Sequence, residues 1–362
     1  MSSPDDRVGP IDPDALARRA LAGPRPVAIV GPTASGKSAL ALEVARRARA
    51  ARSGVTAGGG TDDDGAPGSV ELVSIDSMAV YRGMDIGTAK PDRPTREEVP
   101  YHLLDLADPS EEFTVQQFQA AAAAALDGIA ARGRSAVLVG GTGLYLRSVI
   151  DELHFPGRFP EVAAALRAEL AASPDAPAAT RALHARLAAL DPVAAGRMEP
   201  TNERRVVRAL EVTIGSGRPF SSFGPGLGAY PPSRFTLVGL RGDPEGEPRR
   251  IAERFDRMMD AGLLDEVRRL AARPGGLSTT ARQGLGYREL LGHLEDGVPL
   301  AEAVDEAVRR TRAFARRQWA WFRRDPRIVW LDPRDDPAGS VLEALRAGTG
   351  PDGGPAPVGG PS

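Results

Sequence analysis

The chain has 362 residues, enough for two or three domains or for one large domain with an insertion. Hydrophobic residues make up 42% and charged residues 26%, a balance typical of a globular protein with a buried core. The net charge of −2 excludes a uniformly basic protein but leaves room for a local basic stripe. The absence of cysteine excludes disulfide frameworks, thiolate metal sites and cysteine nucleophiles.

The hydropathy of the chain predicts a cytoplasmic protein without membrane contact. No apolar run approaches the roughly 18 residues that span a bilayer. The N-terminus is acidic and contains proline, so it lacks the basic and apolar regions of a signal peptide. The four histidines are widely spaced, so a histidine-rich metal site is not expected.

The first half of the chain alternates predicted strands and helices. Apolar runs predict the strands, and the spacing between them favours a parallel α/β sheet. The segment at 53–69 has almost no large apolar residue and is expected to be a disordered loop. The predicted elements are a flexible tail at 1–23, strands at Pro26–Val30, Val70–Ile75 and Ser135–Val139, and helices at Lys37–Ala51 and Ala120–Ala131.

The second half starts with a purely helical pattern and then returns to the sheet. Pro160–Ala195 is rich in Ala, Leu and Arg without any strand signal, so we assign 151–200 to a helical insertion domain. The core is then expected at 24–150 and 201–332, followed by a disordered tail at 333–362. Its later elements are predicted as strands at Phe235–Leu240 and Ile328–Leu331 and helices at about 246–272, 286–296 and 300–323.

The segment GPTASGKS at Gly31–Ser38 matches a phosphate-binding loop, because it follows a predicted strand and opens a helix. Glycines let backbone N–H groups face phosphate oxygens, and the helix N-terminus adds partial positive charge. Lys37 supplies a full charge, and Ser38 offers a hydroxyl to Mg²⁺. Such a loop binds a di- or triphosphate that need not belong to ATP. The alternative is a glycine turn that only begins a helix.

Two polar residues follow the next strands of the predicted sheet. Asp76 lies just beyond the second strand, on the edge where α/β proteins place their ligands, and could hold Mg²⁺ or accept a proton. Thr142 follows Gly140 and Gly141 after the third strand. Each has a structural alternative, as the cap of a turn or of a helix. Lys90 is a further candidate for phosphate contact.

Eight ordered segments resemble the tRNA dimethylallyltransferase (tRNA isopentenyltransferase) family over roughly residues 24–332. The segments are GPTASGKS from Gly31, DSMAVYRGMDIGTAKP from Asp76, YHLLDLADPSEEFTVQQF from Tyr101, LVGGTGLYL from Leu138, NERRVVRALEV from Asn202, RIAERFDRMMDAGLLDEV from Arg250, QGLGYREL from Gln283 and TRAFARRQWAWF from Thr311. The resemblance implies a P-loop NTPase-like parallel sheet core with a helical insertion domain that serves tRNA.

The resemblance also implies an activity. The family transfers a dimethylallyl group from its diphosphate to N6 of the adenosine just 3′ of the anticodon, in tRNAs that read codons beginning with U. By similarity, Asp76 is the general base, Thr142 lies near the base and the donor, and Arg254 with Arg250 holds the departing pyrophosphate. The residues implied to bind the donor diphosphate are Gly31, Pro32, Thr33, Ala34, Ser35, Gly36, Lys37 and Ser38, the last through Mg²⁺. We expect a monomer whose partners are dimethylallyl diphosphate and a tRNA anticodon stem-loop.

The same similarity implies a set of tRNA contacts. These residues are Asp76, Ser77, Met78, Ala79, Arg204, Arg205, Arg208, Arg282, Gln283, Gly286 and Tyr287. Ala79 stands where many family members carry glutamine, so one contact to the tRNA loop is missing here. From spacing alone, Arg204 and Arg208 are one helical turn apart and could equally form a solvated helix face.

The window Arg309–Arg324 contains seven arginines, no acid and four large aromatic residues. Such a mixture suits contacts to phosphates and base faces of RNA. An amphipathic helix with aromatics in the core and arginines in solvent explains it equally well. Without the resemblance, two other functions stay open: a small-molecule P-loop kinase, which would consume ATP, and a non-catalytic RNA-binding module, which would turn over no diphosphate.

Overall fold

The computed structural model describes residues 25–53, 69–243 and 245–347, which form two compact units. Unit 1 combines Met1–Ile150 with Pro232–Ser362, and unit 2 is Asp151–Pro231. The predicted tail at 1–23 lies outside the described residues, as does nearly all of the predicted loop at 53–69.

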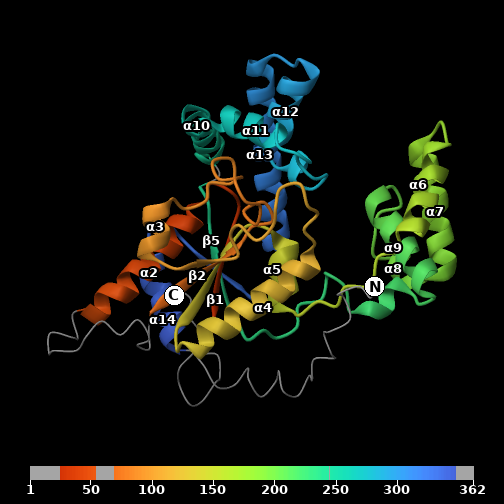
Figure 1. The fold of residues 1–362 in the computed structure, drawn as a ribbon. Coiled ribbons are helices and arrows are strands. Elements are labelled where there is room, and N and C mark those ends of the chain that lie inside the picture. The colour runs from red at the N-terminus through yellow and green to blue at the C-terminus, as the bar shows by residue number, and fades with distance from the viewer. Residues whose placement is uncertain (1–24, 54–68, 244, 348–362) are drawn as a thin grey trace, which may run out of the picture. The chain divides into compact units, whose positions relative to one another are not determined.

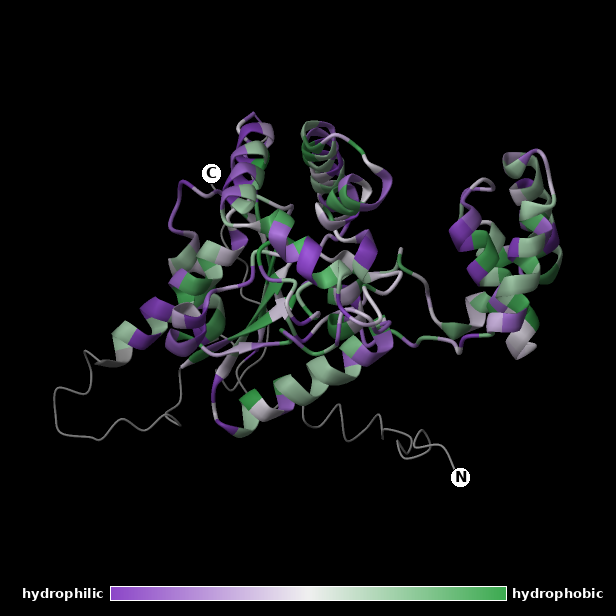
Figure 2. Cartoon of the chain, turned by 45° about the horizontal axis from the view of Figure 1, so that its top comes forward, coloured by the Kyte–Doolittle hydropathy of each residue, from purple (hydrophilic) through white to green (hydrophobic). Residues whose placement is uncertain are grey.

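Unit 1 is built on a six-stranded sheet with the order β3-β2-β4-β1-β5-β6 (Figure 1). All five strand pairings are parallel, which confirms the predicted α/β class. The longer strands are mainly apolar and buried because both faces of the sheet are covered, as the hydrophobic centre of this unit in Figure 2 shows. Their bounds are β1 Val27–Val30, β2 Val70–Ile75, β3 Tyr101–His102, β4 Ser135–Gly140, β5 Thr236–Leu240 and β6 Ile328–Leu331.

Helices cover the two faces of this sheet. Helices α2 (Lys37–Ser53) and α14 (Pro337–Ala347) share one hydrophobic cluster with the sheet, and α4 (Val115–Ala131) and α5 (Gly143–Ile150) share the other. None of the helices in the described ranges is both long and apolar enough to cross a membrane. The remaining helical elements of this unit are α3 Arg93–Glu98, α10 Glu247–Asp260, α11 Leu263–Ala271, η2 Ala281–Gln283, α12 Tyr287–Asp296 and α13 Leu300–Phe322.

Helix α14 corrects the expectation of a disordered tail from residue 333. Its residues Ala338, Val341 and Leu345 recur at helical spacing and are buried against the same cluster as α2. The Gly, Pro and Asp residues around this short stripe hide it in the composition. Of the predicted tail, only 348–362 lies outside the described residues.

Unit 2 is a helical subdomain that ends later than the predicted boundary at residue 200. Its helix α9 carries Val206, Val207 and Leu210 into a small core formed with leucines of the preceding helices. Helix α9 therefore belongs to this unit, which extends to Pro231. Its helical elements are α6 Pro160–Ala171, α7 Ala176–Leu190, α8 Pro192–Ala195, α9 Glu203–Ser216 and η1 Phe220–Phe223.

The strand register aligns three loops of unit 1. Gly140 of β4 pairs with Val30 of β1 on one side and with Ile75 of β2 on the other. Because the strands are parallel, the segments that begin at Gly31, Asp76 and Gly141 leave the same edge of the sheet at the same level. The three motifs that are far apart in the sequence therefore meet at one site.

Candidate active site

The phosphate-loop motif joins β1 to α2. Gly36 has φ +91°, a left-handed conformation that favours glycine, and the chain then enters α2 at Lys37. The Lys37 ammonium donates to the carbonyl of Pro32 at 2.9 Å, so it curls back over its own loop. Ser38 lies exposed in the first turn of α2. The segment thus has the geometry of an anion cradle: a turning backbone, a helix N-terminus and one ammonium group.

The two carboxylate oxygens of Asp76 differ in their contacts. Its Oδ1 accepts the backbone N–H groups of Met78 at 2.8 Å and Ala79 at 3.2 Å, which shapes the turn after β2. In the described part of the chain, its Oδ2 has no hydrogen-bond or ion-pair partner. One carboxylate oxygen therefore holds the turn while the other is free to accept a proton or bind a cation.

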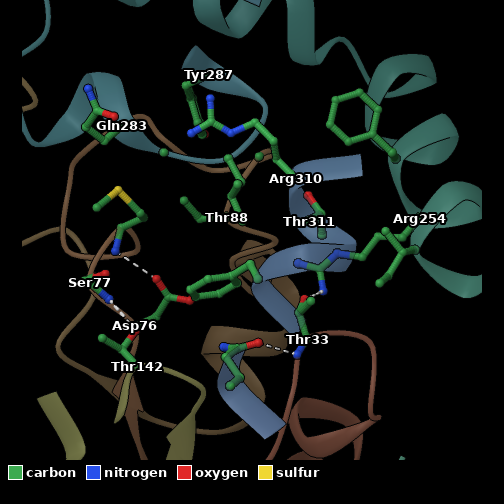
Figure 3. Close-up of a pocket in the computed structure, with 18 of the residues that line it drawn as sticks. Thr33, Asp76, Ser77, Thr88, Thr142, Arg254, Gln283, Tyr287, Arg310 and Thr311 are labelled. Carbon is green, nitrogen blue, oxygen red and sulfur yellow. Dashed lines mark hydrogen bonds between the residues drawn. The ribbon is translucent and has the colours of Figure 1, made fainter. Parts of the chain in front are cut away.

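Thr142 lies beside Asp76, as Figure 3 shows. Its Oγ1 accepts the backbone N–H of Ser77 at 3.4 Å, and its carbonyl accepts the N–H of Leu146 at the start of α5. Thr142 thus immediately precedes α5 and also lines the cavity.

Helix α10 brings two arginines to the phosphate loop. The Arg254 guanidinium donates to the Thr33 hydroxyl at 3.3 Å and lines the cavity on the side opposite Asp76 (Figure 3). Arg250 donates to the carbonyl of Ala34 at 3.3 Å and pairs with Asp243 at 3.1 Å. Arg254 thus faces the cavity, whereas Arg250 supports the loop from outside.

Burial and the nearby charge of Arg254 lower the pKa of Lys37 from 10.5 to about 8, against the opposing charge of Asp76. Burial also lowers the pKa of Arg254, opposed by the charge of Asp76. Two cations held close together in a partly dry site repel each other. They form a site whose electrostatic balance improves when an anion binds between them.

The cavity has a volume of about 330 Å³ and is formed within unit 1. Its charged and hydroxylated part comes from the loops after β1, β2 and β4 and from α10, α12 and α13, whereas apolar side chains supply the rest of the wall. These apolar residues are Ile251, Phe255, Met258, Leu285 and Phe314. The cavity therefore suits a ligand with an anionic head and an apolar body.

Gln318 on α13 is a residue of the site that was not predicted from the sequence. Its side chain is buried, and its Oε1 accepts the backbone N–H of Thr33 at 2.8 Å while its Nε2 donates to the carbonyl of Gly141 at 2.8 Å. It therefore ties the phosphate loop to the loop after β4. A signal was present, because Gln318 shares helical spacing with Ala315 and Phe322, which are both buried.

The arginine-rich window splits between the two sequence interpretations. Arg310 and the largely exposed Arg317 line the cavity together with Phe314, whereas Arg309, Arg316, Arg323 and Arg324 are exposed outside it. Ala315 and Phe322 are buried, as expected for an amphipathic helix.

The residues implied in tRNA contact fall into three places. Ser77, Met78, Gln283 and Tyr287 line the cavity together with Asp76, and Gly286 immediately precedes Tyr287. Ala79 is buried in the turn after β2, and Arg282 pairs with Glu295 at the surface. Arg204, Arg205 and Arg208 belong to α9 of unit 2.

Lys90 is not free for the phosphate contact considered from the sequence. Its side chain is fully buried, and its Nζ donates to the carbonyl of Tyr81 at 2.6 Å, to Asp85 at 2.8 Å and to Asp105 at 2.6 Å. An ammonium group has three protons, so all of its donors are engaged within its own surroundings.

A family model described as IPP transferase matches residues 79–325, which is more than half of the chain. The chain belongs to the IPP transferase family. It is 46% identical over 321 residues to the tRNA dimethylallyltransferase of Salinispora arenicola, covering 89% of this chain and 85% of the relative. It is also 46% identical over 312 residues to that of Thermobifida fusca, covering 86% and 90%.

A solved structure agrees with this membership. The tRNA isopentenylpyrophosphate transferase from Bacillus halodurans is 34% identical, with a TM-score of 0.60 over 90% of this chain and 98% of that chain. The family resemblance that the eight sequence segments indicated is confirmed.

Proposed function

We propose that this protein transfers the dimethylallyl group of dimethylallyl diphosphate to N6 of the adenosine 3′ of the anticodon, in tRNAs that read codons beginning with U. The observations that carry the proposal are a cavity lined by Asp76, by Thr33 of the anion cradle and by an apolar wall, and an Asp76 Oδ2 without a hydrogen-bond partner among the described residues. An ATP-dependent kinase would not need the apolar wall for the group that it transfers. The tRNA dimethylallyltransferases similar to this chain support the same activity.

The chemistry follows from the reactants. The adenine N6 amine is a weak nucleophile, because its lone pair is delocalised into the ring. An allylic diphosphate compensates by breaking its C1–O bond early, and negative charge then accumulates on the departing pyrophosphate. The new bond forms between N6 and C1, and the electron pair of the broken bond leaves with the pyrophosphate.

In this reaction Lys37, the backbone amides of Gly31–Ser38 and Arg254 stabilise the charge that develops on pyrophosphate. Such preorganised donors are effective because they act more strongly in the transition state than in the ground state. The free Oδ2 of Asp76 accepts the proton that N6 loses as it becomes cationic. Thr142 and Gln318 hold the carboxylate turn and the phosphate loop at a fixed spacing.

The residues present fit a Mg²⁺ ion bound mainly through the substrate. Among the described residues no group of three or more His, Asp or Glu side chains could hold a metal. The Ser38 hydroxyl lies exposed beside the cradle, so Mg²⁺ would take this one protein ligand with diphosphate oxygens and water. When bound, the ion neutralises charge on the leaving pyrophosphate.

The upper part of the cavity is where we place the tRNA. Gln283 and Tyr287 lie above Asp76 in Figure 3, Ser77 lies beside it, and Met78 lines the same cavity. We assign Gly286 and Arg282 to the same tRNA surface. The target adenosine must leave its stack in the loop to reach the donor, as enzymes acting on bases require. Because the cavity is complete within one chain, we propose a monomer, acting in the cytoplasm where tRNA is available.

The charge of Lys37 predicts how donor binding depends on pH. With a pKa of about 8, the Lys37 amine carries its positive charge below that pH and loses it above. The value of kcat/KM for the donor should therefore fall as the pH rises through about 8. The measurement is kcat/KM against pH at saturating RNA. Lys37→Arg should remove this limb in whatever activity it retains, because a guanidinium stays charged. A limb that persists in this variant would assign it to another group.

Helix α9 offers a test of RNA contact outside the cavity. Arg204 and Arg205 are exposed, whereas Arg208 is engaged with Glu211 at 2.7 Å and with the carbonyl of Pro156 at 2.8 Å. Replacing Arg204 and Arg205 by alanine should weaken tRNA binding and reduce the slope of log K against log salt by about 1 to 2. Arg208→Ala is the contrast, since it should mainly destabilise unit 2. An unchanged salt slope would return Arg204 and Arg205 to a solvated helix face.

The activity itself is tested by mass. The protein is incubated with Mg²⁺, dimethylallyl diphosphate and an unmodified anticodon stem-loop. The RNA is then digested to nucleosides, and their masses are measured by mass spectrometry. We expect one adenosine to gain a dimethylallyl group, and ATP to be neither needed nor consumed. Rapid ATP turnover with unaltered RNA mass would contradict the proposal and favour a kinase.

A further inference from the structure

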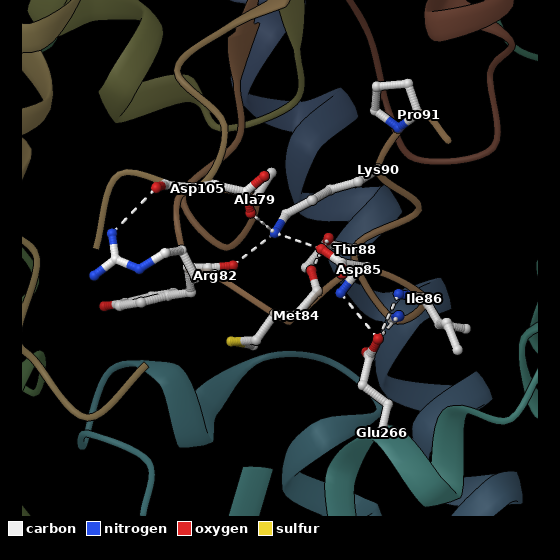
Figure 4. Close-up of polar contacts among 12 residues, drawn as sticks. Ala79, Arg82, Met84, Asp85, Ile86, Thr88, Lys90, Pro91, Asp105 and Glu266 are labelled. Atoms are coloured by element: carbon white, nitrogen blue, oxygen red, sulfur yellow. Dashed lines mark hydrogen bonds and ion pairs between the residues drawn. The ribbon is translucent and has the colours of Figure 1, made fainter. Parts of the chain in front are cut away.

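Glu266 of α11 is a buried carboxylate whose known partners are all neutral donors. It is 3% exposed. Its Oε2 accepts the backbone N–H groups of Asp85 at 3.0 Å and Ile86 at 2.9 Å, as Figure 4 shows. Its Oε1 accepts the N–H of Gly87 at 3.3 Å and the hydroxyl of Tyr287 at 2.6 Å. One side chain therefore gathers three successive backbone amides and a tyrosine from a different part of the chain.

The burial of α11 does not require this carboxylate. Leu263, Val267 and Leu270 already anchor the helix in the main hydrophobic cluster. Burying a carboxylate is costly unless hydrogen bonds replace its water. The four donors meet that need, and in return the backbone of the loop gains acceptors that an apolar residue at this position could not supply.

Both groups that Glu266 holds reach the cavity. Gly87, the adjacent Thr88 and Tyr287 all line it. A Cβ atom added to Gly87 would overlap the ring of Tyr287, so the loop and the ring are in direct contact. Burial and the charge of Glu266 both raise the pKa of Tyr287, which keeps its hydroxyl protonated as a donor. The loop and the tyrosine thus form one continuous wall, with Glu266 behind it.

Lys90 holds the same loop at its other end. Two of its hydrogen bonds connect the loop to Asp105 and to the carbonyl of Tyr81, and the third is an ion pair with the side chain of Asp85, whose backbone N–H Glu266 accepts (Figure 4). Within the loop, the Thr88 hydroxyl donates to the carbonyl of Met84 at 2.6 Å. Lys90 thus fixes the ends of the loop, whereas Glu266 fixes the backbone between them, including Gly87 at the cavity.

We infer that Glu266 is a positioning residue that fixes the wall formed by Gly87, Thr88 and Tyr287 against the nucleoside of the RNA substrate. The inference rests on the proposed function, because Tyr287 belongs to the surface assigned there to tRNA. Thr33 of the phosphate loop and Arg254 also line the cavity, but among the described residues neither forms a hydrogen bond or ion pair with Glu266. Loss of the carboxylate should therefore impair RNA binding and leave donor binding intact.

The test is Glu266→Gln, which keeps the size of the side chain but turns one acceptor into a donor that faces donors. KM for the stem-loop should rise about tenfold, the effect of one poorly satisfied buried group. KM for dimethylallyl diphosphate should stay within about twofold. The control is Asp265→Asn on the exposed side of the same helix, which should change neither constant.

A purely structural role would lower the fraction of active enzyme, so that kcat falls while both KM values stay constant, and this result would overturn the inference. Should Glu266→Gln not fold, Tyr287→Phe and Gly87→Ala disturb the same wall from its other members and should give the same split. Equal KM values for the stem-loop in those variants and the wild type would also overturn it. Failure of the proposed function is distinct, since the wild-type protein would then modify no RNA.

Discussion

Replacing Asp76 by asparagine should lower kcat by about 10² or more, the usual scale for a lost general base. The asparagine side-chain oxygen can still accept the N–H groups of Met78 and Ala79, so the turn after β2 should persist. What is lost is the second oxygen, which as an amide nitrogen can no longer take a proton from N6. The measurement is single-turnover modification of a stem-loop with saturating donor.

The binding of tRNA and of donor should change little in this variant, because the cradle and the surface around Tyr287 stay in place. Asp305→Asn provides the matched control, since this carboxylate is exposed on α13 and outside the cavity. A loss confined to tRNA affinity, with an unchanged single-turnover rate, would remove Asp76 from the proton transfer.

The part of the site that the sequence predicts is the part encoded by contiguous residues. The phosphate loop at Gly31–Ser38 is a local structure, in which a strand, a glycine turn and a helix follow one another. Asp76 and Thr142 could also be predicted, because each follows a buried strand and parallel strands end at the same edge of the sheet. Local pattern and the rule of the sheet edge were sufficient for these residues.

The rest of the site depends on helices that approach the sheet from far along the chain. Gln318 contacts Thr33 across 285 positions, and no local pattern specifies that pairing. Glu266 looks in the sequence like one more acid on an amphipathic helix. Arg254 was identified through the family resemblance alone. Lys90, which the sequence left open as a phosphate contact, is instead engaged by three acceptors that the sequence does not reveal.

The element boundaries failed for a related reason. Helix α9 was assigned to the core because the Ala-, Leu- and Arg-rich pattern of the insertion ends at Ala195, whereas Val206, Val207 and Leu210 pack within unit 2. Helix α14 was not predicted, because glycines and prolines surround its short apolar stripe. In both cases three apolar residues at helical spacing determined the packing, and the surrounding composition concealed them.

Arg254→Ala should reduce kcat/KM for the donor by about 10² to 10³, the scale expected when one charged donor to a developing oxyanion is removed. Arg254 reaches the cavity beside Thr33 and next to the buried ammonium of Lys37. Without the guanidinium, the charge released as the C1–O bond breaks meets one cation instead of two. The loss should therefore be larger in kcat than in KM, because the charge is greater in the transition state than in the bound donor.

Arg257→Ala is the control for this variant, since Arg257 lies one turn or less away on the same helix but is exposed and outside the cavity. It should keep nearly full activity, which separates a specific contact from the general positive charge of α10. A rise in donor KM with unchanged kcat in Arg254→Ala would mean that the guanidinium binds the ground state and the transition state equally. Stabilisation of the leaving group would then have to come from Lys37 and the backbone amides of the phosphate loop, with Arg254 serving only to capture the donor.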